Sequence, residues 1–382
     1  MNVNMHKLNM ILKKRKNYLN QQYQPFGSAL KQKRKEKSMT LVEACKNICS
    51  ISYFSKVENN QIIPSYSKKM LLQERFHIPE QFLNESLFEE EIQIWINFLL
   101  YGDIEDKDKL MRIRFEENHY GWMHQYLHDV YIENKVSSIQ SLYDYFDRYN
   151  DDALFLLLYT FARVAFEHHF YQQAYDILTV IDLNLYENDK IKFLYEEIMM
   201  KTSFYCHKTL YFLESVKRVE QLGLVLEKYE SIKDAKKRLI AYHAMYQKHS
   251  DLSQIDHHFM GHVMYAKDLK IEDLDVLPVS EVSLMIMFKQ NDPKLSEKIS
   301  RFSQPDHILT KWLNTYLENN REKMLEFLRN MLHQEVLSKY GYEVLHFIYT
   351  QSSIYFEQSN FYKEASQLNK KGYMILNQLR IA

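Results

Sequence analysis

Residues 26–64 read FGSALKQKRKEKSMTLVEACKNICSISYFSKVENNQIIP, and this stretch decides how the rest of the sequence is interpreted. Its first third is strongly basic, and we expect it to form a short helix. Thr40 and Glu43 have the spacing of a capping box, in which two residues cap each other's backbone N–H groups at a helix start. Ser50 is expected to cap a further helix over Ile51–Asn59. The stretch therefore predicts short helices joined by tight turns.

The helix expected over Ile51–Asn59 has two unlike faces. Phe54 and Val57 lie three residues apart, so both can face a core. The opposite side and the N-terminal end carry small, polar and aromatic groups. Two short helices joined by a tight turn, the second presenting such groups, fit reading of the DNA major groove. The residues expected to face DNA bases and backbone are Ser50, Ile51, Ser52, Tyr53 and Lys56.

Basic side chains crowd the helix that opens the stretch, and Lys and Arg are the residues that neutralise DNA phosphates. The phosphate candidates are Lys31, Lys33 and Arg34. Residues 1–75 carry 15 Lys+Arg against 4 Asp+Glu, whereas the remainder carries 34 against 46. A basic N-terminal domain attracts phosphate and an acidic body does not. The alternative is that charge varies along the chain by chance.

Several residues of this region match a known pattern. They run without a gap between Phe26 and Pro79: Thr40, Asn47-Ile48-Cys49, Ser55-Lys56-Val57-Glu58 for the usual Ser-Arg-Ile-Glu, Pro64-Ser65 and Ile78-Pro79. With these residues the region resembles the Cro-type (XRE) helix-turn-helix and, within it, the PlcR-like members of the peptide-sensing RRNPP regulators. Two positions depart from the pattern. Leu41 stands where a Gln that helps hold the DNA is usual, and Asn60 stands where Gly is usual.

The resemblance implies a transcription regulator of the quorum-sensing type. One such DNA-binding domain covers a short half-site, so we expect a homodimer on double-stranded DNA with a near-palindromic operator. The body is then expected to bind a short signalling peptide that is secreted and reimported. Peptide binding would shift the population between two dimer geometries. The pattern also offers Arg34 a second role, an ion pair with Glu58 inside the domain.

The composition predicts an all-α protein. The chain has 382 residues, enough for two domains or one long array. It contains only 7 Gly and 6 Pro, far below ordinary usage, which favours helices with short loops and argues against glycine-rich phosphate loops. The 29 Tyr and 22 Phe residues supply large side chains for packing between helices.

Three segments of the body share a shape: a helix that ends in aromatic residues, a tight polar turn and an amphipathic helix. They are residues 162–178, 353–365 and, more weakly, 202–213. They are similar to the tetratricopeptide (TPR) turn, where an aromatic residue precedes the second helix and a small Ala lets the helices approach. Degenerate repeats of this kind predict a right-handed superhelical array of helix pairs. Its concave face suits an extended peptide.

We divide the chain into a basic N-terminal arm (1–24), a helix-turn-helix domain (25–88) and a TPR-like repeat domain for peptide sensing and dimerisation (89–382). The second boundary lies where the charge changes sign, at Glu89-Glu90-Glu91, although a helix can run straight across it. Residues 1–24 are interpreted as a frayed terminus, with an arm that enters a DNA minor groove as the alternative.

The cysteines and the hydropathy indicate a cytoplasmic protein. There are three cysteines, Cys45, Cys49 and Cys206, too few for a disulfide framework. Buried structural thiols are the expected role of the first two, with a redox switch as the alternative. No run of 18 apolar residues is present, so we expect no membrane span. The basic run Lys13–Lys16 has no apolar segment after it, unlike a signal peptide.

Motifs for chemistry are missing from the sequence. It contains no phosphate-binding glycine loop and no HExxH zinc motif, so we expect no catalytic residues, no metal and no cofactor. His168-His169 and His257-His258 are adjacent pairs. Neighbours on a helix point about 100° apart, so we interpret all four as solvated or packing side chains. An enzyme would carry a buried, coupled acid–base set, which the sequence does not reveal.

The peptide-binding residues are the least determined by the sequence. Asn side chains on inner helices are attractive, because an amide can both donate to and accept from a peptide backbone. The candidates are Asn97 and Asn314, each set among aromatic and aliphatic residues. A surface Asn near a helix end is the alternative for each. The alternative for the whole body is a scaffold that binds a folded protein partner, as in a phage or plasmid control circuit.

Overall fold

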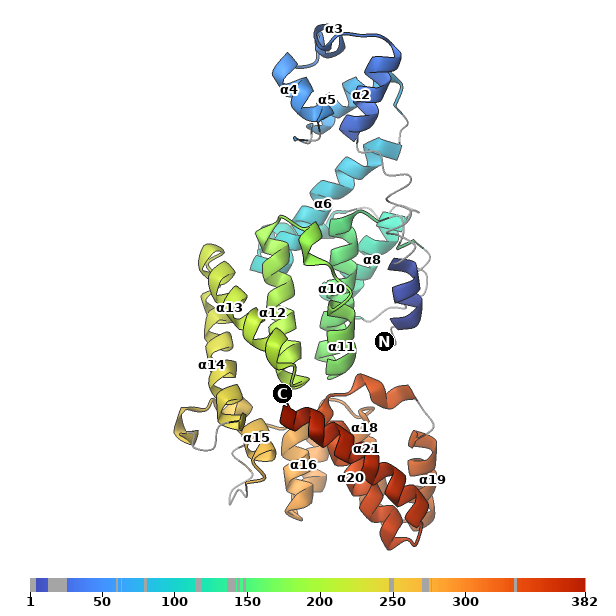
Figure 1. Ribbon diagram of the computed structural model, residues 1–382, viewed down its shortest axis with the longest axis vertical. Coiled ribbons are helices and arrows are strands. Elements are labelled where there is room, and N and C mark those ends of the chain that lie inside the picture. Colours follow the sequence, from blue (N-terminus) through green and yellow to red (C-terminus); the bar gives the residue numbers. More distant parts are fainter. Residues whose placement is uncertain are drawn as a thin grey trace. The chain divides into compact units, whose positions relative to one another are not determined.

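All regular secondary structure in the described part of the chain is helical, as the composition predicts (Figure 1). The fold is that of a computed structural model. It describes residues 5–12, 26–59, 61–62, 64–78, 81–113, 119–135, 142, 145–146, 149–246, 251–269, 275, 277–332 and 335–381. Asn60 and Pro79, which belong to the sequence pattern above, lie outside the described residues, as does most of the 1–24 arm.

The chain divides into two compact units, Met1–Leu157 and Leu158–Ala382. The named helices of the first unit are α2 (Phe26–Glu36), α3 (Leu41–Cys45), α4 (Ile51–Glu58), α5 (Tyr66–Phe76), α6 (Gln81–Tyr101), α7 (Ile104–Met111) and α8 (His119–Tyr131). Helix α10 (Asp151–Glu167) runs from the first unit into the second.

The second unit continues with helices and short 3-10 turns, labelled η. They are α11 (Tyr171–Leu178), η1 (Leu183–Leu185), α12 (Asp189–Tyr205), α13 (Thr209–Val225), α14 (Tyr229–Tyr246), η2 (Leu252–Gln254), α15 (His257–Ala266), α16 (Glu281–Lys289), α17 (Leu295–Arg301), α18 (Ile308–Leu317), α19 (Arg321–Leu332), η4 (Glu335–Lys339), α20 (Tyr342–Gln358) and α21 (Tyr362–Ile381).

Residues Phe26–Ile78 form a small helical domain with its own core, which we call the head. Its buried apolar side chains come from four helices and the end of the segment: Leu30, Ala44, Cys45, Phe54, Val57, Leu72, Phe76 and Ile78. Phe54 and Val57 thus face the core as predicted. Burial of such side chains gives each of these short helices the stability that it lacks alone.

The turns of the head use left-handed residues where glycine is absent. Ser38, Asn47 and His77 have φ values of 52°, 64° and 51°. After Ser38 and His77, the next backbone N–H donates to a carbonyl five residues earlier, which satisfies an orphan carbonyl of the ending helix. Asn tolerates this conformation better than most residues, and the others are held in it by the turn.

The remainder of the first unit is built around α6. This helix runs through Glu89–Glu91, so the boundary expected there lies inside a continuous helix. Trp95 Nε1 donates to His124 Nδ1 at 2.9 Å, and His124 Nε2 lies 2.8 Å from Glu91 Oε2. These bonds tie α6 to α8 through groups that would be costly to bury without a partner.

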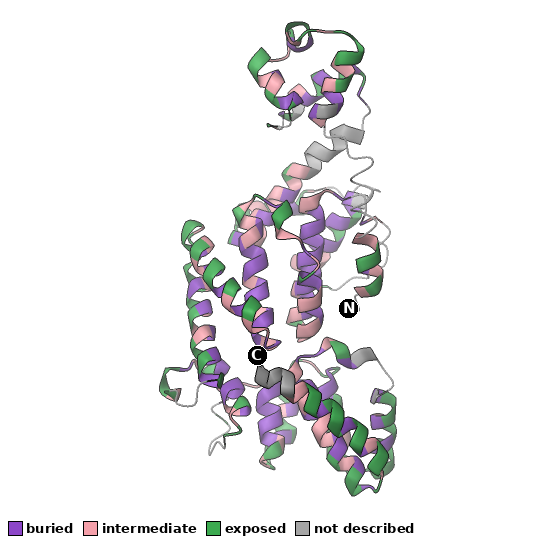
Figure 2. Cartoon of the chain, in the orientation of Figure 1, coloured by how far each residue is buried: buried purple, intermediate pink, exposed green. Residues whose placement is uncertain are grey.

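In the second unit most helices pack against their neighbours in sequence. Helix α11 packs on α12, α12 on α13, α13 on α14, and α20 on α21. Other pairings join parts that are farther apart in the sequence, such as α11 with η4 and α16 with α20. Figure 2 shows α12 buried along most of its length, which agrees with the run of buried side chains from Ile191 to Phe204.

The three turns singled out by the sequence share one backbone geometry. His169, His207 and Asn360 have φ values of 60°, 53° and 67°, and each is followed by a backbone N–H that donates five residues back at 2.8 or 2.9 Å. This hydrogen bond, which joins the first and the sixth residue of a six-residue segment, is characteristic of the Schellman motif at helix C-termini. The polar turns therefore stop one helix and redirect the chain into the next without glycine.

None of the helices in the described part of the chain combines the length and the apolar character that a bilayer crossing requires.

Candidate nucleic-acid interface and buried polar network

Side-chain caps fix the start of α3 and of α4. The Thr40 N–H donates to Glu43 Oε2 at 2.7 Å and the Glu43 N–H donates to Thr40 Oγ1 at 3.3 Å, so the predicted capping box is confirmed. Ser50 Oγ accepts from the N–H of Tyr53 at 3.2 Å, which confirms the predicted cap of α4. The remaining free N–H groups of this helix start favour negative charge nearby.

The N-terminal end of α4 is open to solvent. The exposed members of the predicted DNA-facing set are Ser50, Ile51, Ser52 and Lys56. Tyr53 is half-buried, and its hydroxyl accepts from the Ser65 N–H at 3.3 Å. The Lys68 ammonium lies 4.2 Å from the centre of the Tyr53 ring. The structure thus places Ser50 to Tyr53 at the N-terminal end of α4 and Lys56 in its last turn. It adds Lys68, which the sequence did not single out.

Two of the phosphate candidates make exposed contacts within the head. Lys31 Nζ donates to Asn59 Oδ1 at 2.9 Å, and Lys33 Nζ donates to Glu36 Oε2 at 2.8 Å. Such surface contacts are worth about 0–1 kcal/mol, so either ammonium can exchange its partner for a phosphate at little cost.

Arg34 differs from the two lysines. Its Nε and Nη2 donate to Glu58 at 2.6 and 3.2 Å, and its Nη1 donates to the Met39 carbonyl at 2.8 Å. The two charged side chains are only 15% and 3% exposed. The hydrogen-bond donors of Arg34 are therefore directed into the head. Arg34 forms the ion pair with Glu58 that was the second role expected for it.

Lys46 is a basic residue that sequence reasoning passed over. It is exposed and ends α3, in the turn that leads to Ser50. It is the one cation in the five residues between α3 and α4, and that position was the signal that could have identified it.

The cysteines of the head agree with a structural role. Cys45 is buried, and Cys49 is half-buried; both are free thiols. Burial raises the pKa of the Cys49 thiol, and the nearby Cys45 adds to the shift. A raised pKa leaves little of the reactive thiolate at neutral pH.

The two peptide-binding candidates occupy separate parts of the chain. Asn97 is half-buried on α6, in the first unit. Asn314 is exposed on α18, in the second unit, and lies one turn from the end of that helix. For Asn314 the location matches the alternative of a surface Asn near a helix end.

Inside the second unit, Glu281 is buried between two histidines. It opens α16 and its carboxylate contacts His169 Nδ1. His307 Nε2 lies 3.8 Å from the same carboxylate oxygen. The Tyr171 hydroxyl lies 2.9 Å from His169 Nδ1. His169 and Tyr171 are two residues apart, whereas Glu281 lies 112 residues from His169.

A second buried carboxylate repeats the arrangement. Glu343, on α20, has Oε2 2.8 Å from His262 Nδ1 and Oε1 3.3 Å from His207 Nε2. His207 Nδ1 also lies 2.6 Å from the Tyr246 hydroxyl. We call the two glutamates and their four histidines the His–Glu network.

The charges of the His–Glu network are set by burial and by pairing. Burial alone would raise the pKa of Glu343, but the charges and hydrogen bonds of His262 and His207 outweigh it and hold this pKa well below its usual range. Glu281 behaves likewise beside His169. Burial lowers the pKa of His307 to about 4, while Glu343 raises the pKa of His262 above its ordinary value despite burial.

Arg238 adds a buried cation near the network. Its guanidinium carbon lies 5.5 Å from the centre of the Tyr205 ring and 4.8 Å from that of Phe259. Its Nε donates to Asp234 Oδ2 at 2.9 Å, but its Nη1 has no hydrogen-bond partner in the described residues. Aromatic faces of this kind stabilise a cation that is removed from water.

The network departs from the sequence-based interpretation of His169 as a solvated or packing side chain. A buried, coupled acid–base set is also the feature that we expected an enzyme to carry. Its members pack against aromatic rings, as His262 does against Tyr205 at 5.1 Å. The arrangement can hold helix ends together through buried charge, and it places the Tyr171 and Tyr246 hydroxyls beside histidine ring nitrogens.

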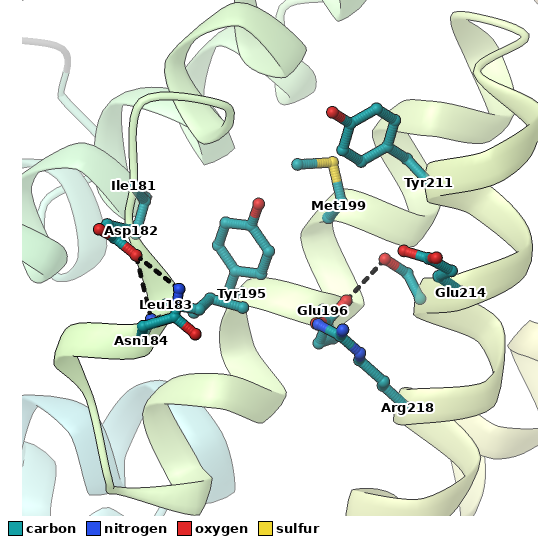
Figure 3. A pocket seen from close by; sticks show the side chains of 11 residues that line it. Ile181, Asp182, Leu183, Asn184, Tyr195, Glu196, Met199, Tyr211, Glu214 and Arg218 are labelled. Atoms are coloured by element: carbon teal, nitrogen blue, oxygen red, sulfur yellow. Dashed lines mark hydrogen bonds and ion pairs between the residues drawn. The ribbon is translucent and has the colours of Figure 1, made fainter.

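A pocket of about 220 Å³ opens elsewhere in the second unit, between η1, α12 and α13 (Figure 3). Two tyrosines, a methionine and three carboxylates contribute to its walls: Tyr195, Tyr211, Met199, Asp182, Glu196 and Glu214. The sequence did not predict this pocket, because its residues come from segments that show only the ordinary helical pattern.

The adjacent histidines at the start of α15 are exposed, as predicted. With Asp256 they are the one group in the described residues whose ligand atoms approach closely enough for a metal ion. His258 Nδ1 lies 3.0 Å from Asp256 Oδ1, and Lys237 Nζ lies 2.7 Å from Asp256 Oδ2. Because the carboxylate already caps α15 and pairs with Lys237, a metal would have to displace that lysine.

Comparisons with protein-family models, with curated proteins and with solved structures find no match to this chain.

Proposed function

We propose that this protein is a cytoplasmic DNA-binding transcription regulator controlled by a short signalling peptide. In this proposal the head is an XRE-type helix-turn-helix and the body is a right-handed array of TPR-like helix pairs. The observation that carries the proposal is the capped, solvent-open N-terminal end of α4, which presents Ser50–Tyr53 beside basic side chains. A helix end of this kind can enter a major groove and read base edges.

The roles in the head follow from exposure and partners. Ser52 and Tyr53 are proposed to contact base edges, and Lys56 and Lys46 to contact phosphates. Lys31 and Lys33 join them by exchanging their weak partners for phosphate. Arg34 is proposed to hold α2 to the end of α4 through Glu58, and so to set the angle at which α4 is presented.

A homodimer completes the proposed DNA reader. One head covers a few base pairs, and useful specificity requires two half-sites about one helical turn apart. We therefore propose a near-palindromic operator. No catalytic role is proposed for the chain.

The body is proposed to sense the peptide. Its support is the packing of successive helices in the second unit and the shared turn geometry at His169, His207 and Asn360. Asn97 and Asn314 remain candidates for peptide contacts. Because a ligand shifts an equilibrium only by its differential affinity, the peptide would have to bind one of two dimer geometries more tightly.

DNA binding by the full-length protein tests the head. Tyr53→Ala and Lys56→Ala are expected to weaken binding to a selected duplex in fluorescence anisotropy, the first with loss of sequence preference and the second with a smaller salt dependence. Lys107→Ala, which removes an exposed lysine of α7, is the matched control. Unchanged binding by both variants would remove α4 from the recognition role.

A thermal-shift screen against short peptides encoded beside the gene tests the body. A peptide that binds the native state raises the melting temperature by mass action, by several degrees at saturating concentration. DNA binding is then measured with and without that peptide. If no peptide of about 5–10 residues stabilises a protein that still binds DNA, the peptide-sensing role fails.

An exposed apolar group favours one alternative, a repeat domain that binds a folded protein partner. Leu224, Val225 and Tyr229 are all strongly exposed at the turn between α13 and α14. A scaffold of this kind would respond to the folded partner and not to short peptides. The same thermal-shift screen separates the two functions.

A further inference from the structure

The pocket between η1, α12 and α13 is large enough for one side chain. Its volume is about 220 Å³, and a cavity of about 150 Å³ already holds benzene. Figure 3 shows η1 on one side, α13 on the other and Tyr195 of α12 between them. All its walls belong to the second unit.

The charges of the pocket do not balance. It contains three carboxylates and one guanidinium. Arg218 Nη1 donates to Glu196 Oε1 at 2.6 Å, and Ser215 Oγ donates to Glu196 Oε2 at 2.6 Å, so this carboxylate is satisfied and the arginine is neutralised. Asp182 caps η1 by accepting from the Asn184 N–H at 3.2 Å. Glu214 is exposed at the rim and makes no ion pair in the described residues.

Tyr195 supplies a second, independent indication of a ligand. The residue is only 8% exposed, yet its hydroxyl points into the pocket and has no hydrogen-bond partner in the described residues (Figure 3). A ligand group that enters the pocket can hydrogen-bond to this hydroxyl in place of water. Burial raises the pKa of this hydroxyl, so it stays neutral and can accept a hydrogen bond from a cationic donor.

The apolar walls define the rest of the ligand. Met199 and Ile181 line the pocket beside the rings of Tyr195 and Tyr211. Aromatic faces attract a cation, and an aliphatic stem packs against methionine. Just outside, Leu210 is 75% exposed beside Tyr211 and is available to an apolar neighbour of the cationic group.

We propose that this pocket binds the side chain of one Lys or Arg residue of the signalling peptide, with Glu214 pairing with its charge and Tyr195 accepting a hydrogen bond from it. This inference rests on the proposed peptide-sensing function. It goes further by assigning the pocket residues and by predicting a basic residue flanked by apolar ones in the peptide.

Three pools of fluorescein-labelled heptapeptides test the inference. The centre of each peptide is fixed as Leu-Lys-Leu, Leu-Gln-Leu or Leu-Glu-Leu, and the outer positions are random. In fluorescence anisotropy with the full-length protein, the lysine pool is expected to bind at least about five-fold more tightly than the glutamine pool. This corresponds to about 1 kcal/mol, the scale of one partly exposed charge pair.

Two variants assign the preference to the pocket. Glu214→Gln is expected to remove most of the lysine preference, and Tyr195→Phe to reduce it about two- to three-fold. Glu220→Gln, on the same helix but outside the pocket, is the matched control and should leave it unchanged. Thermal unfolding of each variant confirms that it is folded.

The possible failures are distinguishable. If peptides bind equally well whatever their central residue, the inference is overturned while peptide sensing stands. A lysine preference that survives both Glu214→Gln and Tyr195→Phe also overturns it, because the charge is then read elsewhere. If no pool binds to a protein that binds DNA, the proposed peptide function falls together with the inference.

Discussion

The head and the second unit bury charge in different ways. The buried ion pair of the head, Arg34–Glu58, joins residues 24 positions apart on helices that the local sequence already predicts. In the second unit Glu343 pairs with His262, 81 residues away, and Glu281 pairs with His169, 112 residues away. The head can thus be interpreted locally, whereas the network exists only once the helices have assembled.

The largest expected loss of stability comes from a substitution that breaks the His–Glu network. Glu343→Gln removes the charge that faces His262 and His207, and breaking a buried pair in this way typically costs about 3–5 kcal/mol. Urea unfolding followed by far-UV circular dichroism should show this loss. Glu357→Gln, an exposed glutamate of the same helix, is the control. A loss below about 1 kcal/mol would mean that the network contributes little to the fold.

The matching change in the head is Arg34→Ala. It leaves Glu58 buried without its partner, so we expect the head to lose about 2–4 kcal/mol. Hydrogen exchange should show the loss in α2 and α4 while the amides of α12 keep their protection. Lys35→Ala, at an exposed neighbouring position, is the control. Equal loss of protection in both regions would contradict the independence of the head.

A fall in pH is expected to lower the stability of the second unit more than that of the head. The folded pKa of His307, about 4, lies below its ordinary value of 6.5, so the unfolded chain binds more protons between these values. The contribution of neutral His307 is therefore complete above pH 6.5 and is lost as the pH falls towards 4. The loss that His307 alone contributes is on the order of 3 kcal/mol. The raised pKa of His262 acts in the opposite direction and offsets part of it.

His307→Asn sharpens the pH test, because Asn can still cap α18 as His307 does by accepting from the Leu309 N–H. In this variant the loss of stability between pH 6.5 and 4 should be smaller. The only histidine within the head is the exposed His77. The hydrogen-exchange protection of the backbone amides of the head should therefore change less between pH 6.5 and 4. An unchanged pH profile in His307→Asn would show that other groups produce it.

The smallest expected effect concerns a local cap. Thr40→Ala removes the side-chain acceptor of the Glu43 N–H, and such caps contribute about 1 kcal/mol. This loss of stability should appear as faster hydrogen exchange of the backbone amides of α3. Thr40→Ser keeps the hydroxyl and should retain most of the protection. If the two variants behave alike, the capping box is not what holds the start of α3.

Whether the sequence could predict a feature depends on how far apart its interacting residues lie along the chain. The caps at Thr40 and Ser50 and the core positions Phe54 and Val57 depend on residues three or four apart, which a single sequence displays. The Tyr195 pocket and the pairing of His169 with Glu281 depend on chain segments that only the fold brings together. For this reason the sequence predicted the elements of the head but neither the pocket nor the network.

The most direct test of the central proposal is selection of binding sites from a pool of random duplex DNA by the full-length protein. The account predicts enrichment of an inverted repeat with half-sites about one helical turn apart. It also predicts that the enrichment is lost in Tyr53→Ala and kept in Lys107→Ala. If the wild-type protein enriches no sequence at low salt, the head is not a sequence-specific DNA reader and the proposed function is wrong.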